Sequence, residues 1–155
     1  MVPITGRNDK RVLTVALNLR TGRRVVWLAC DQRQENFQAF LGELRRRYRR
    51  RPIYLLLDEL SSHKSLRSQA LGAQLGVHLS WLPKQHPELN PVDQLFKELK
   101  AKLAANRQFR SMEAEALAAH VWLVLLTNLD ARRKAGLLSK NCWLKKVCQN
   151  FCLPT

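Results

Sequence analysis

The pattern of hydrophobic positions predicts two strands near the start of the chain. The segment "VLTVALNL" (12–19) places apolar residues at every second position, and "RVVWLAC" (24–30) is also strand-like. Such alternation is typical of a strand with one buried face. The residues "RTGR" (20–23) between them predict a turn, because Gly22 can adopt positive φ. Together these segments predict an antiparallel hairpin.

After the hairpin the apolar positions change to helical spacing. The stripe that predicts a helix over 34–50 consists of Phe37, Leu41, Leu44 and Tyr48. Pro52 ends this helix, and the continuous apolar run "IYLLL" (53–57) is typical of a central strand covered on both faces. A helix over 64–75 and a strand over 77–82 follow, which predicts a βαβ unit.

The second half of the chain is predicted to be helical. The loop "PKQHPELNP" (83–91) leads into a helix that begins at Asn90 and Pro91, the residue types favoured at the N-cap and first turn. Another helix is predicted over 111–129. The order β-β-α-β-α-β-α-α predicts an α/β domain over residues 1–130, with one mixed sheet in which the strand 53–57 is internal. Residues 131–155 form a basic tail with six Lys or Arg and no acid.

Charge narrows the class of partner. The 155 residues carry 27 Lys and Arg against 12 Asp and Glu, a net charge of +15, and 46% of them are hydrophobic. Such a surface favours polyanions, above all nucleic acid, and the alternative is a solvated cationic surface without a particular partner. Neither a secretory signal nor an apolar run long enough for a bilayer is evident, so a cytoplasmic protein is expected.

The cysteines add little to this picture. None of Cys30, Cys142, Cys148 and Cys152 forms a CxxC pair, and the last three have no histidine nearby. A zinc site is therefore the weaker interpretation, and reduced thiols are the better one.

Two carboxylates are candidates for chemistry. Asp58 follows the central strand, where open α/β sheets usually place their sites, and Asp93 lies in the first turn of the helix after "PELNP". The intervening βα unit brings the chain back beside its start, so the two carboxylates are expected within roughly 4–8 Å, able to share Mg²⁺ ions. The alternatives are structural: Asp58 caps the turn at 59–64, and Asp93 favours the helix dipole.

Two longer segments resemble a known family. "LLLDELSSHKS" followed by "LSWLPKQHPELNPVDQLFKELKAKLAANRQF" is similar to the DDE endonuclease domain of mariner-like bacterial insertion-sequence transposases. In that family a strand ends in a catalytic Asp with a His a few residues on, and "LPxxxPELNPxE" ends in another catalytic acid. The resemblance covers about residues 10–130 and implies an RNase H-like fold, with the hairpin and βαβ unit flanked by helices.

The resemblance implies roles for individual residues. Asp58 and Asp93 match the second and third catalytic acids and would bind two Mg²⁺ or Mn²⁺ ions in the complete site. His63, Asn90 and Glu59 are supporting residues, although Glu59 stands where the family usually has Asn. Double-stranded DNA, both transposon ends and target, is the expected partner, and a homodimer is expected in the active complex. The residues predicted to contact DNA are Arg45, Arg46, Arg49, Arg50, Lys64, Lys84, Lys97 and Lys100. For the arginines an equal alternative is structural, because cations at the end of the helix predicted over 34–50 suit its negative pole.

One part of the family pattern is not found in the sequence. The family's first acid lies on a strand before the hairpin, whereas Asp9 follows no apolar strand and Asp31 follows the second hairpin strand. The first strand and its acid are therefore expected to be missing, so that an upstream transposase segment would supply them. The predicted function is the downstream part of a transposase catalytic domain. The alternatives are an inactive nucleic-acid-binding remnant and a structural or interaction protein.

Overall fold

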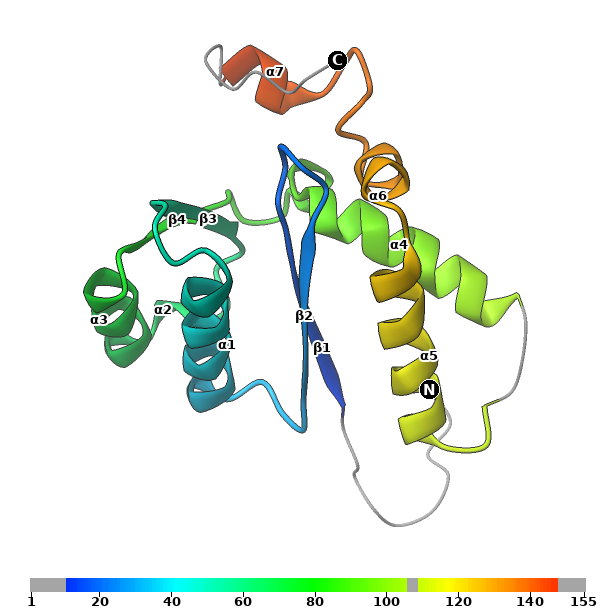
Figure 1. Ribbon diagram of the computed structural model, residues 1–155, viewed down its shortest axis with the longest axis horizontal. Helices are drawn as coiled ribbons and strands as arrows, with labels where there is room; N and C mark the ends of the chain where they lie inside the picture. Colours follow the sequence, from blue (N-terminus) through cyan, green and yellow to red (C-terminus); the bar gives the residue numbers. More distant parts are fainter. Residues whose placement is uncertain (1–10, 106–108, 148–155) are drawn as a thin grey trace.

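The predicted hairpin is present in the structure, a computed structural model that describes residues 11–105 and 109–147 (Figure 1). Strand β1 (Val12–Leu17) pairs antiparallel with β2 (Arg24–Ala29), and the register joins the start of β1 to the end of β2. Both strands are slightly shorter than the sequence predicts. The hairpin lies in the middle of the molecule, between two groups of helices (Figure 1).

The turn of the hairpin depends on Gly22, as the sequence predicts. Its φ is 78°, a region that residues with a Cβ rarely adopt. A Cβ at this position would also lie 2.1 Å from the carbonyl oxygen of Asn128. Arg24 next to the turn donates to the carbonyl oxygens of Leu123 (2.7 Å) and Leu126, so the hairpin tip also satisfies the end of a helix.

The helix predicted after the hairpin forms as α1 (Gln34–Arg47). Phe37, Leu41 and Leu44 from the predicted stripe are buried, and the half-buried Tyr48 packs against the same cluster. This cluster also contains Val25 of β2, so α1 covers one face of the hairpin.

The predicted βαβ unit is confirmed, with one change. It consists of β3 (Ile53–Leu57), α2 (Ser61–Lys64), α3 (Leu66–Gln74) and β4 (Val77–Trp81), with β3 and β4 parallel. The single helix predicted over 64–75 is instead two helices, because Ser65 is extended with ψ of 143°. Its side-chain oxygen accepts a hydrogen bond from the backbone N–H of Ser68 (3.2 Å), which caps α3.

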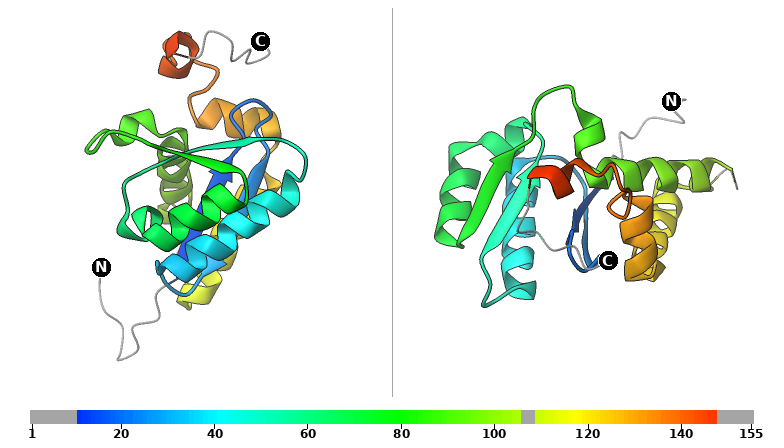
Figure 2. Two further views of the ribbon diagram at one scale, coloured as in Figure 1. Left: turned by 90° about the vertical axis from the view of Figure 1, so that its left-hand side faces the viewer. Right: turned by 90° about the horizontal axis from the view of Figure 1, so that it is seen from above.

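The prediction of one mixed sheet with 53–57 internal is wrong for the described part of the chain. Strands β1 and β2 form one two-stranded sheet, and β3 and β4 form another, as the views in Figure 2 also show. The physical reason is that no strand within the described residues lies between β1 and β3 to join them. Each of the four strands therefore keeps one edge that no described strand pairs.

The other face of the hairpin is covered by α4 (Pro91–Ala104) and α5 (Met112–Leu125). The apolar residues of α4 recur at helical spacing and join the cluster that these helices form with β1 and β2: Val92, Leu95, Phe96, Leu99 and Leu103. Val26 of β2 packs against this cluster, whereas its neighbour Val25 packs against α1. Because successive residues of a strand point to opposite faces, α1 and α4 lie on opposite sides of the hairpin.

The helix predicted over 111–129 is also divided in two. Helix α5 ends where Leu126 becomes extended, and α6 (Asn128–Lys134) begins after Thr127. The Thr127 hydroxyl accepts from the backbone N–H of Asp130 (3.0 Å), which supplies the N-cap of a new helix.

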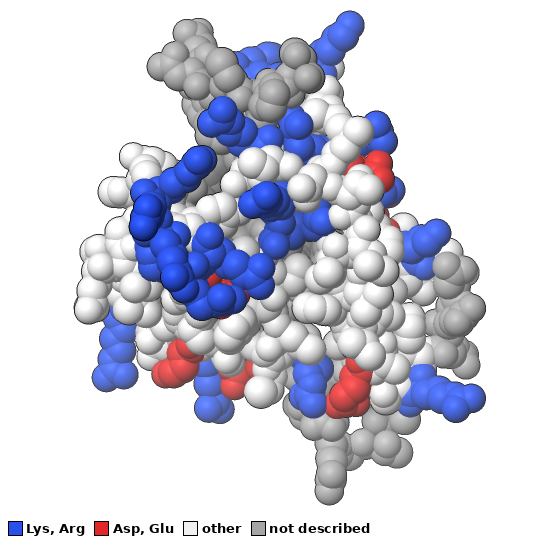
Figure 3. Space-filling model, in the orientation of Figure 1, with Lys and Arg blue, Asp and Glu red and all other residues white. Residues whose placement is uncertain are grey.

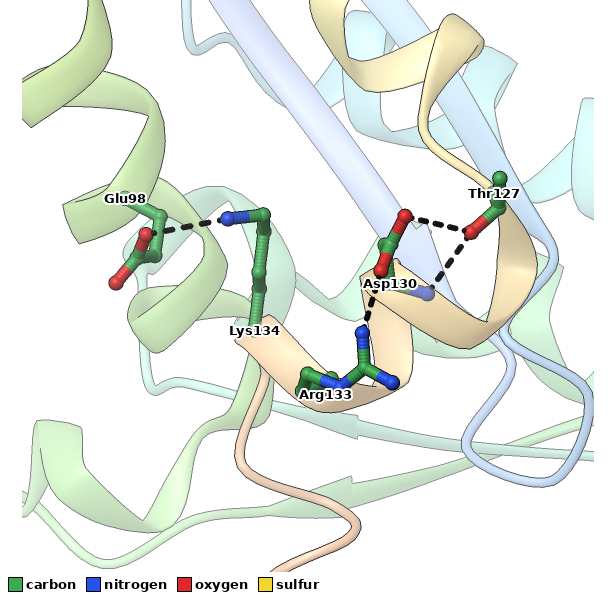
Figure 4. A network of polar contacts seen from close by, with 5 residues as sticks. All are labelled: Glu98, Thr127, Asp130, Arg133 and Lys134. Atoms are coloured by element: carbon green, nitrogen blue, oxygen red, sulfur yellow. Dashed lines mark hydrogen bonds and ion pairs between the residues drawn. The ribbon is translucent and has the colours of Figure 1, made fainter.

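Polar contacts tie α6 to the rest of the fold (Figure 4). The Arg133 guanidinium donates to the Asp130 carboxylate (2.8 Å), and Lys134 reaches across to Glu98 of α4 (3.5 Å). Helix α6 is therefore linked to the helix that carries Asp93.

The predicted basic tail contributes to the packed structure. Leu137 and Leu144 are buried in a cluster with residues of β1 and β3, and α7 (Trp143–Val147) lies beside it. The domain boundary at residue 130 stays a prediction. Cys148 and Cys152 lie outside the described residues. Within the described ranges no helix has both the length and the apolar character needed to cross a bilayer.

Candidate active site

Asp58 lies at the carboxyl end of β3 and is paired with a histidine. His63 Nδ1 is 3.0 Å from the Asp58 carboxylate and 3.2 Å from its backbone carbonyl oxygen. The His63 ring is mostly buried and lies 4.3 Å from the ring of Phe37 on α1. Helix α2 begins after Leu60, without a side-chain cap. Asp58 therefore does not cap this helix, although its contacts with His63 span the turn at 59–64.

Asp93 lies in the first turn of α4, as predicted, and is half-buried. Asn90 caps the helix, because its side-chain oxygen accepts from the backbone N–H of Val92 (3.0 Å). In a capping box the Asp93 carboxylate would accept from the Asn90 N–H, but that N–H donates to the Pro87 carbonyl oxygen (3.1 Å). The Asp93 carboxylate is thus not used as the second half of a capping box.

The two carboxylates influence each other electrostatically. Burial raises the pKa of Asp93 above its ordinary value, and the charge of Asp58 raises it further. Lys97 and Lys100, on the same helix, act in the opposite direction and lower the pKa. A carboxylate whose charge is disfavoured in this way gains from a nearby cation. The pair can therefore serve as hard oxygen ligands for a divalent metal ion.

Both carboxylates line a groove of about 330 Å³, here called the central groove. Its walls are residues 12–17 of β1, residues 54–57 of β3, and side chains of α1 and α4, and His63 and Asn90 also border it. Asp58 and Asp93 also line a second hollow, of about 470 Å³, together with Lys84 and His86. The two acids are thus reachable from both hollows.

The carboxylate of Glu59, a residue that departs from the family pattern, lies close to two lysine side chains. Its carboxylate lies 3.3 Å from Lys64 and 3.4 Å from Lys84, and these contacts lower the pKa of Glu59, with the hydrogen bond from Lys64 the largest cause. Lys64 also lies 5.8 Å from the centre of the Trp81 ring. Glu59 therefore joins α2 to the loop after β4, and its supporting role at the site stays a prediction.

The loop that presents Asp93 is held at two points. Glu88 pairs with His86 (2.7 Å), in agreement with an ordering role for this acid. The indole N–H of Trp143 donates to the Leu89 carbonyl oxygen (3.0 Å). Sequence reasoning missed Trp143, because its polar contact spans 54 residues and no motif marks it. The apolar stretch around it was the only available signal.

The arginines predicted to contact DNA differ in the contacts that their side chains make within the protein. Arg45 donates to backbone carbonyl oxygens at the end of α1 and before β4, and Arg46 forms a bidentate pair with Glu43 (2.7 Å for each bond). Arg49 and Arg50 follow the helix and are exposed. Lys and Arg side chains gather in the upper and left parts of the face in Figure 3, and acidic side chains lie mostly along its lower edge.

A third acid is not brought into the site by the described residues, among which no group of three potential metal ligands occurs. Asp31 borders the central groove, but its carboxylate accepts from the Asn36 side chain (2.6 Å) and the Arg33 backbone N–H (3.0 Å). These hydrogen bonds help to lower the pKa of Asp31. Asp9 lies outside the described residues.

Comparison with known proteins agrees with this arrangement. The structure is similar to the catalytic domain of Mos1 transposase in a structure with Raltegravir and Mg, with a TM-score of 0.66, 19% identity, and coverage of 89% of this chain and 74% of the other. A second structure, of the Mos1 mariner transposase catalytic domain, gives the same TM-score and identity over 86% and 72%. These likenesses show an RNase H-like transposase fold. No match was found among curated proteins. The model of the DDE superfamily endonucleases matches residues 2–114, and the chain therefore belongs to this superfamily.

Proposed function

We propose that this chain is the catalytic domain of a DNA transposase, of the mariner-like bacterial insertion-sequence type, that cleaves DNA strands and transfers them. The observation that carries the proposal is the meeting of two carboxylates at one groove. Asp58 comes from the end of β3 and Asp93 from the start of α4, and both border the central groove. Both also match acids of the family motif.

The residues of the groove fit a hard divalent cation. Asp58 and Asp93 offer carboxylate oxygens, which Mg²⁺ and Mn²⁺ prefer, and the raised pKa of Asp93 reflects a charge that a cation would stabilise. Asp58 and Asp93 would hold such ions, which would supply activation of the attacking water or hydroxyl and charge stabilisation for the leaving oxygen of a phosphodiester. His63 would keep the Asp58 carboxylate oriented through their 3.0 Å contact. The Mg in the structure of the Mos1 domain supports this assignment.

Duplex DNA is the proposed substrate and partner. The net charge of +15 favours a polyanion, and Lys97 and Lys100 lie on the helix that carries Asp93. Phosphate contacts release counterions, so affinity for duplex DNA should fall steeply between low and high salt. A flat salt dependence, or no binding at low salt, would remove this part of the proposal. The family resemblance adds a homodimer as the active complex.

A second candidate is a DNA-binding domain that is inactive by itself. The observation that favours it is the number of acids at the candidate site. The described residues supply two, Asp58 and Asp93, whereas the family uses three. Fewer carboxylates provide fewer ligands and less negative charge for the metal. In this account the chain is the downstream part of a transposase, and an upstream segment supplies the first acid.

The two candidates are separated by nicking of supercoiled plasmid DNA in Mg²⁺ or Mn²⁺. We expect weak or no nicking by the chain alone, and recovery when an upstream strand that carries an Asp is added in cis or in trans. Asp58→Asn and Asp93→Asn should each abolish the recovered nicking. The matched control is Glu88→Gln, which changes an acid of the same loop that pairs with His86. Normal nicking by either Asn variant would overturn the assignment, and no recovery with any strand would favour the inactive domain.

A further inference from the structure

An aromatic pair lies exposed on one face of the sheet formed by β3 and β4. The ring of Tyr54 on β3 is stacked on that of His78, the residue opposite it on β4, with 4.8 Å between the ring centroids and 16° between the ring planes. Tyr54 nevertheless remains 72% exposed. A single exposed apolar residue is common on a protein surface, whereas two stacked rings form a platform on which a third flat ring can be placed.

Packing within the described residues explains the next position of this face but not Tyr54. Leu56 lies on the same face, because alternate residues of a strand share one. It packs against a cluster that contains Leu137 and Leu144, so the segment after α6 covers the strand at this point. Tyr54 belongs to none of the three apolar clusters of the described residues. The exposed pair therefore has no role in the core.

Five arginines near this pair have no partner in the described part of the chain. Asn18 at the hairpin tip donates to the Tyr48 hydroxyl at the end of α1 (3.3 Å), so the loop 18–23 lies beside the loop 48–52 that leads into β3. The two loops carry exposed arginines whose guanidinium groups form no hydrogen bond or ion pair among the described residues: Arg20, Arg23, Arg49, Arg50 and Arg51. Like charges held this close repel one another, and a bound anion relieves the repulsion.

The end of α1 does not account for all of these charges. Cations interact with the negative pole of a helix within its last turn, and Arg45, Arg46 and Arg47 already occupy that turn. The three arginines at 49–51 follow the C-cap residue Tyr48 and lie beyond the helix. The structural alternative for the arginine run therefore applies to its first half and leaves the second half for a partner.

Cations flank the aromatic pair on both sides. The arginines at 49–51 precede Tyr54, and α7, with the exposed Lys145 and Lys146, lies beside the cluster that covers Leu56. Lys and Arg side chains in Figure 3 gather where Figure 1 places the hairpin tip, β3, β4 and α7. Cations around an exposed aromatic side chain are typical of surfaces that bind single-stranded nucleic acid.

We propose that the surface made by Tyr54, His78 and these cations, here called the stacking surface, binds an unpaired stretch of nucleic acid. One base stacks on Tyr54, and the guanidinium and ammonium groups bind the phosphates on either side. Duplex DNA would contact the cations but leave the aromatic pair unused, because its bases are already stacked on one another. Asp58 lies four residues beyond Tyr54, about 13 Å along an extended strand, so the stacking surface is separate from the two acids. Binding here therefore requires neither acid nor metal, and does not depend on the proposed function.

The test uses the full chain in EDTA and measures the fluorescence anisotropy of labelled strands of twelve nucleotides. The chain should bind oligo-dT at least about tenfold more tightly than an abasic strand with the same phosphates, because only oligo-dT has bases to stack. Tyr54→Ala should remove this advantage, and Tyr54→Trp should keep it. The matched control is Leu66→Ala, which truncates a side chain that is 84% exposed on α3. An oligo-U RNA identifies the sugar, since tighter binding of either strand than of the abasic one supports the stacking surface.

The charges are tested by the salt dependence of the same binding. Arg49→Gln and Arg50→Gln together should reduce the slope of log affinity against log salt by about 1.4, because each phosphate contact with a single strand contributes about 0.7. Arg46→Gln should change the slope less, because Arg46 is paired with Glu43.

Three results would overturn the stacking surface: equal binding of oligo-dT and the abasic strand, an undiminished advantage in Tyr54→Ala, or slowed amide hydrogen exchange centred on residues 91–94 instead of 49–54. The last result would place the strand at the acid pair. The proposed function is judged separately, by nicking in Mg²⁺. If oligo-dT binds as described and nicking does not recover, only the proposed function fails. If nicking recovers and Tyr54→Ala binds oligo-dT as the unchanged chain does, only the stacking surface fails.

Discussion

The two acids of the site have different surroundings, although they border the same groove. Asp58 is exposed, at the end of a strand, and its carboxylate is paired with His63. Asp93 is half-buried in the first turn of a helix, and its pKa is raised by burial and by Asp58. One acid is oriented by a partner side chain, and the other is positioned by its backbone. Each should therefore respond to a different set of substitutions.

The largest expected effect is a loss of stability when the hydrogen bond that holds the loop before Asp93 is removed. Trp143→Ala removes the hydrogen bond to the Leu89 carbonyl and packing at α7, and should lower the free energy of unfolding by about 2 kcal/mol. Trp143→Phe should cost about 1 kcal/mol. Urea denaturation measures both, and amide exchange should become faster at Asn90 and beyond.

The matched control for the indole hydrogen bond is Trp27→Phe. The Trp27 Nε1 atom is buried and finds no hydrogen-bond partner within the described residues, so Phe at this position should cost less than Phe at position 143. Equal losses at the two positions would show that the Leu89 contact does not support the loop.

The next effect concerns the orientation of Asp58. His63→Ala removes the contact of 3.0 Å and should weaken Mn²⁺ binding about tenfold, the usual cost of losing a partner of a metal ligand. Titration calorimetry measures the affinity. His78→Ala on β4, which removes a histidine stacked on Tyr54, serves as the control. A change of the same size in both variants would mean that His63 does not act through Asp58.

The lysines near the two acids should also differ in how much they contribute to DNA binding. Lys64 and Lys84 are engaged by Glu59, whereas Lys97 and Lys100 lie near Asp93 on the face of α4. Lys97→Gln and Lys100→Gln should each reduce the slope of log affinity for duplex DNA against log salt by about 0.9. Lys64→Gln and Lys84→Gln should change it less, and the reverse order would contradict this distinction.

The smallest effect is a gain in stability. The pKa of Asp93 is higher in the folded chain than its ordinary value. Ionisation of Asp93 therefore lowers the free energy of unfolding. Asp93→Asn should therefore stabilise the protein at neutral pH, by less than about 1 kcal/mol after solvent screening. The gain should disappear as the pH falls below the ordinary value of 3.8. Thermal unfolding against pH measures it.

The comparison for this last prediction is Asp58→Asn, which alters the contact of 3.0 Å with His63 and should give no gain. Equal stabilisation by both Asn variants would mean that the two acids do not differ in the way described.

The sequence predicts individual elements and the site better than it predicts how the sheets join. Helical spacing in α1 and α4 survives in the structure because each stripe is buried as a unit. The breaks at Ser65 and Thr127 were missed, since polar residues within a helix and at its N-cap look alike without tertiary context. The internal position of 53–57 was inferred from its apolar run, and that run also suits a strand that borders an apolar groove.

The placement of Asp58 and Asp93 at one groove was predictable because it depends on chain order, whereas the distant contacts around them were not. Asp58 and Asp93 follow from the ends of a βα unit, and Asn90 from its residue type. The contacts of Phe37 with His63 and of Trp143 with the Leu89 carbonyl join remote elements, which periodicity does not reveal.

The proposal that Asp58 and Asp93 together bind divalent cations is tested most directly by paramagnetic line broadening of the chain with Mn²⁺. We predict that broadening centres on the end of β3 and the first turn of α4, and that Asp58→Asn or Asp93→Asn removes it, whereas Glu88→Gln preserves it. Broadening centred elsewhere, or unchanged in both Asn variants, would contradict the account.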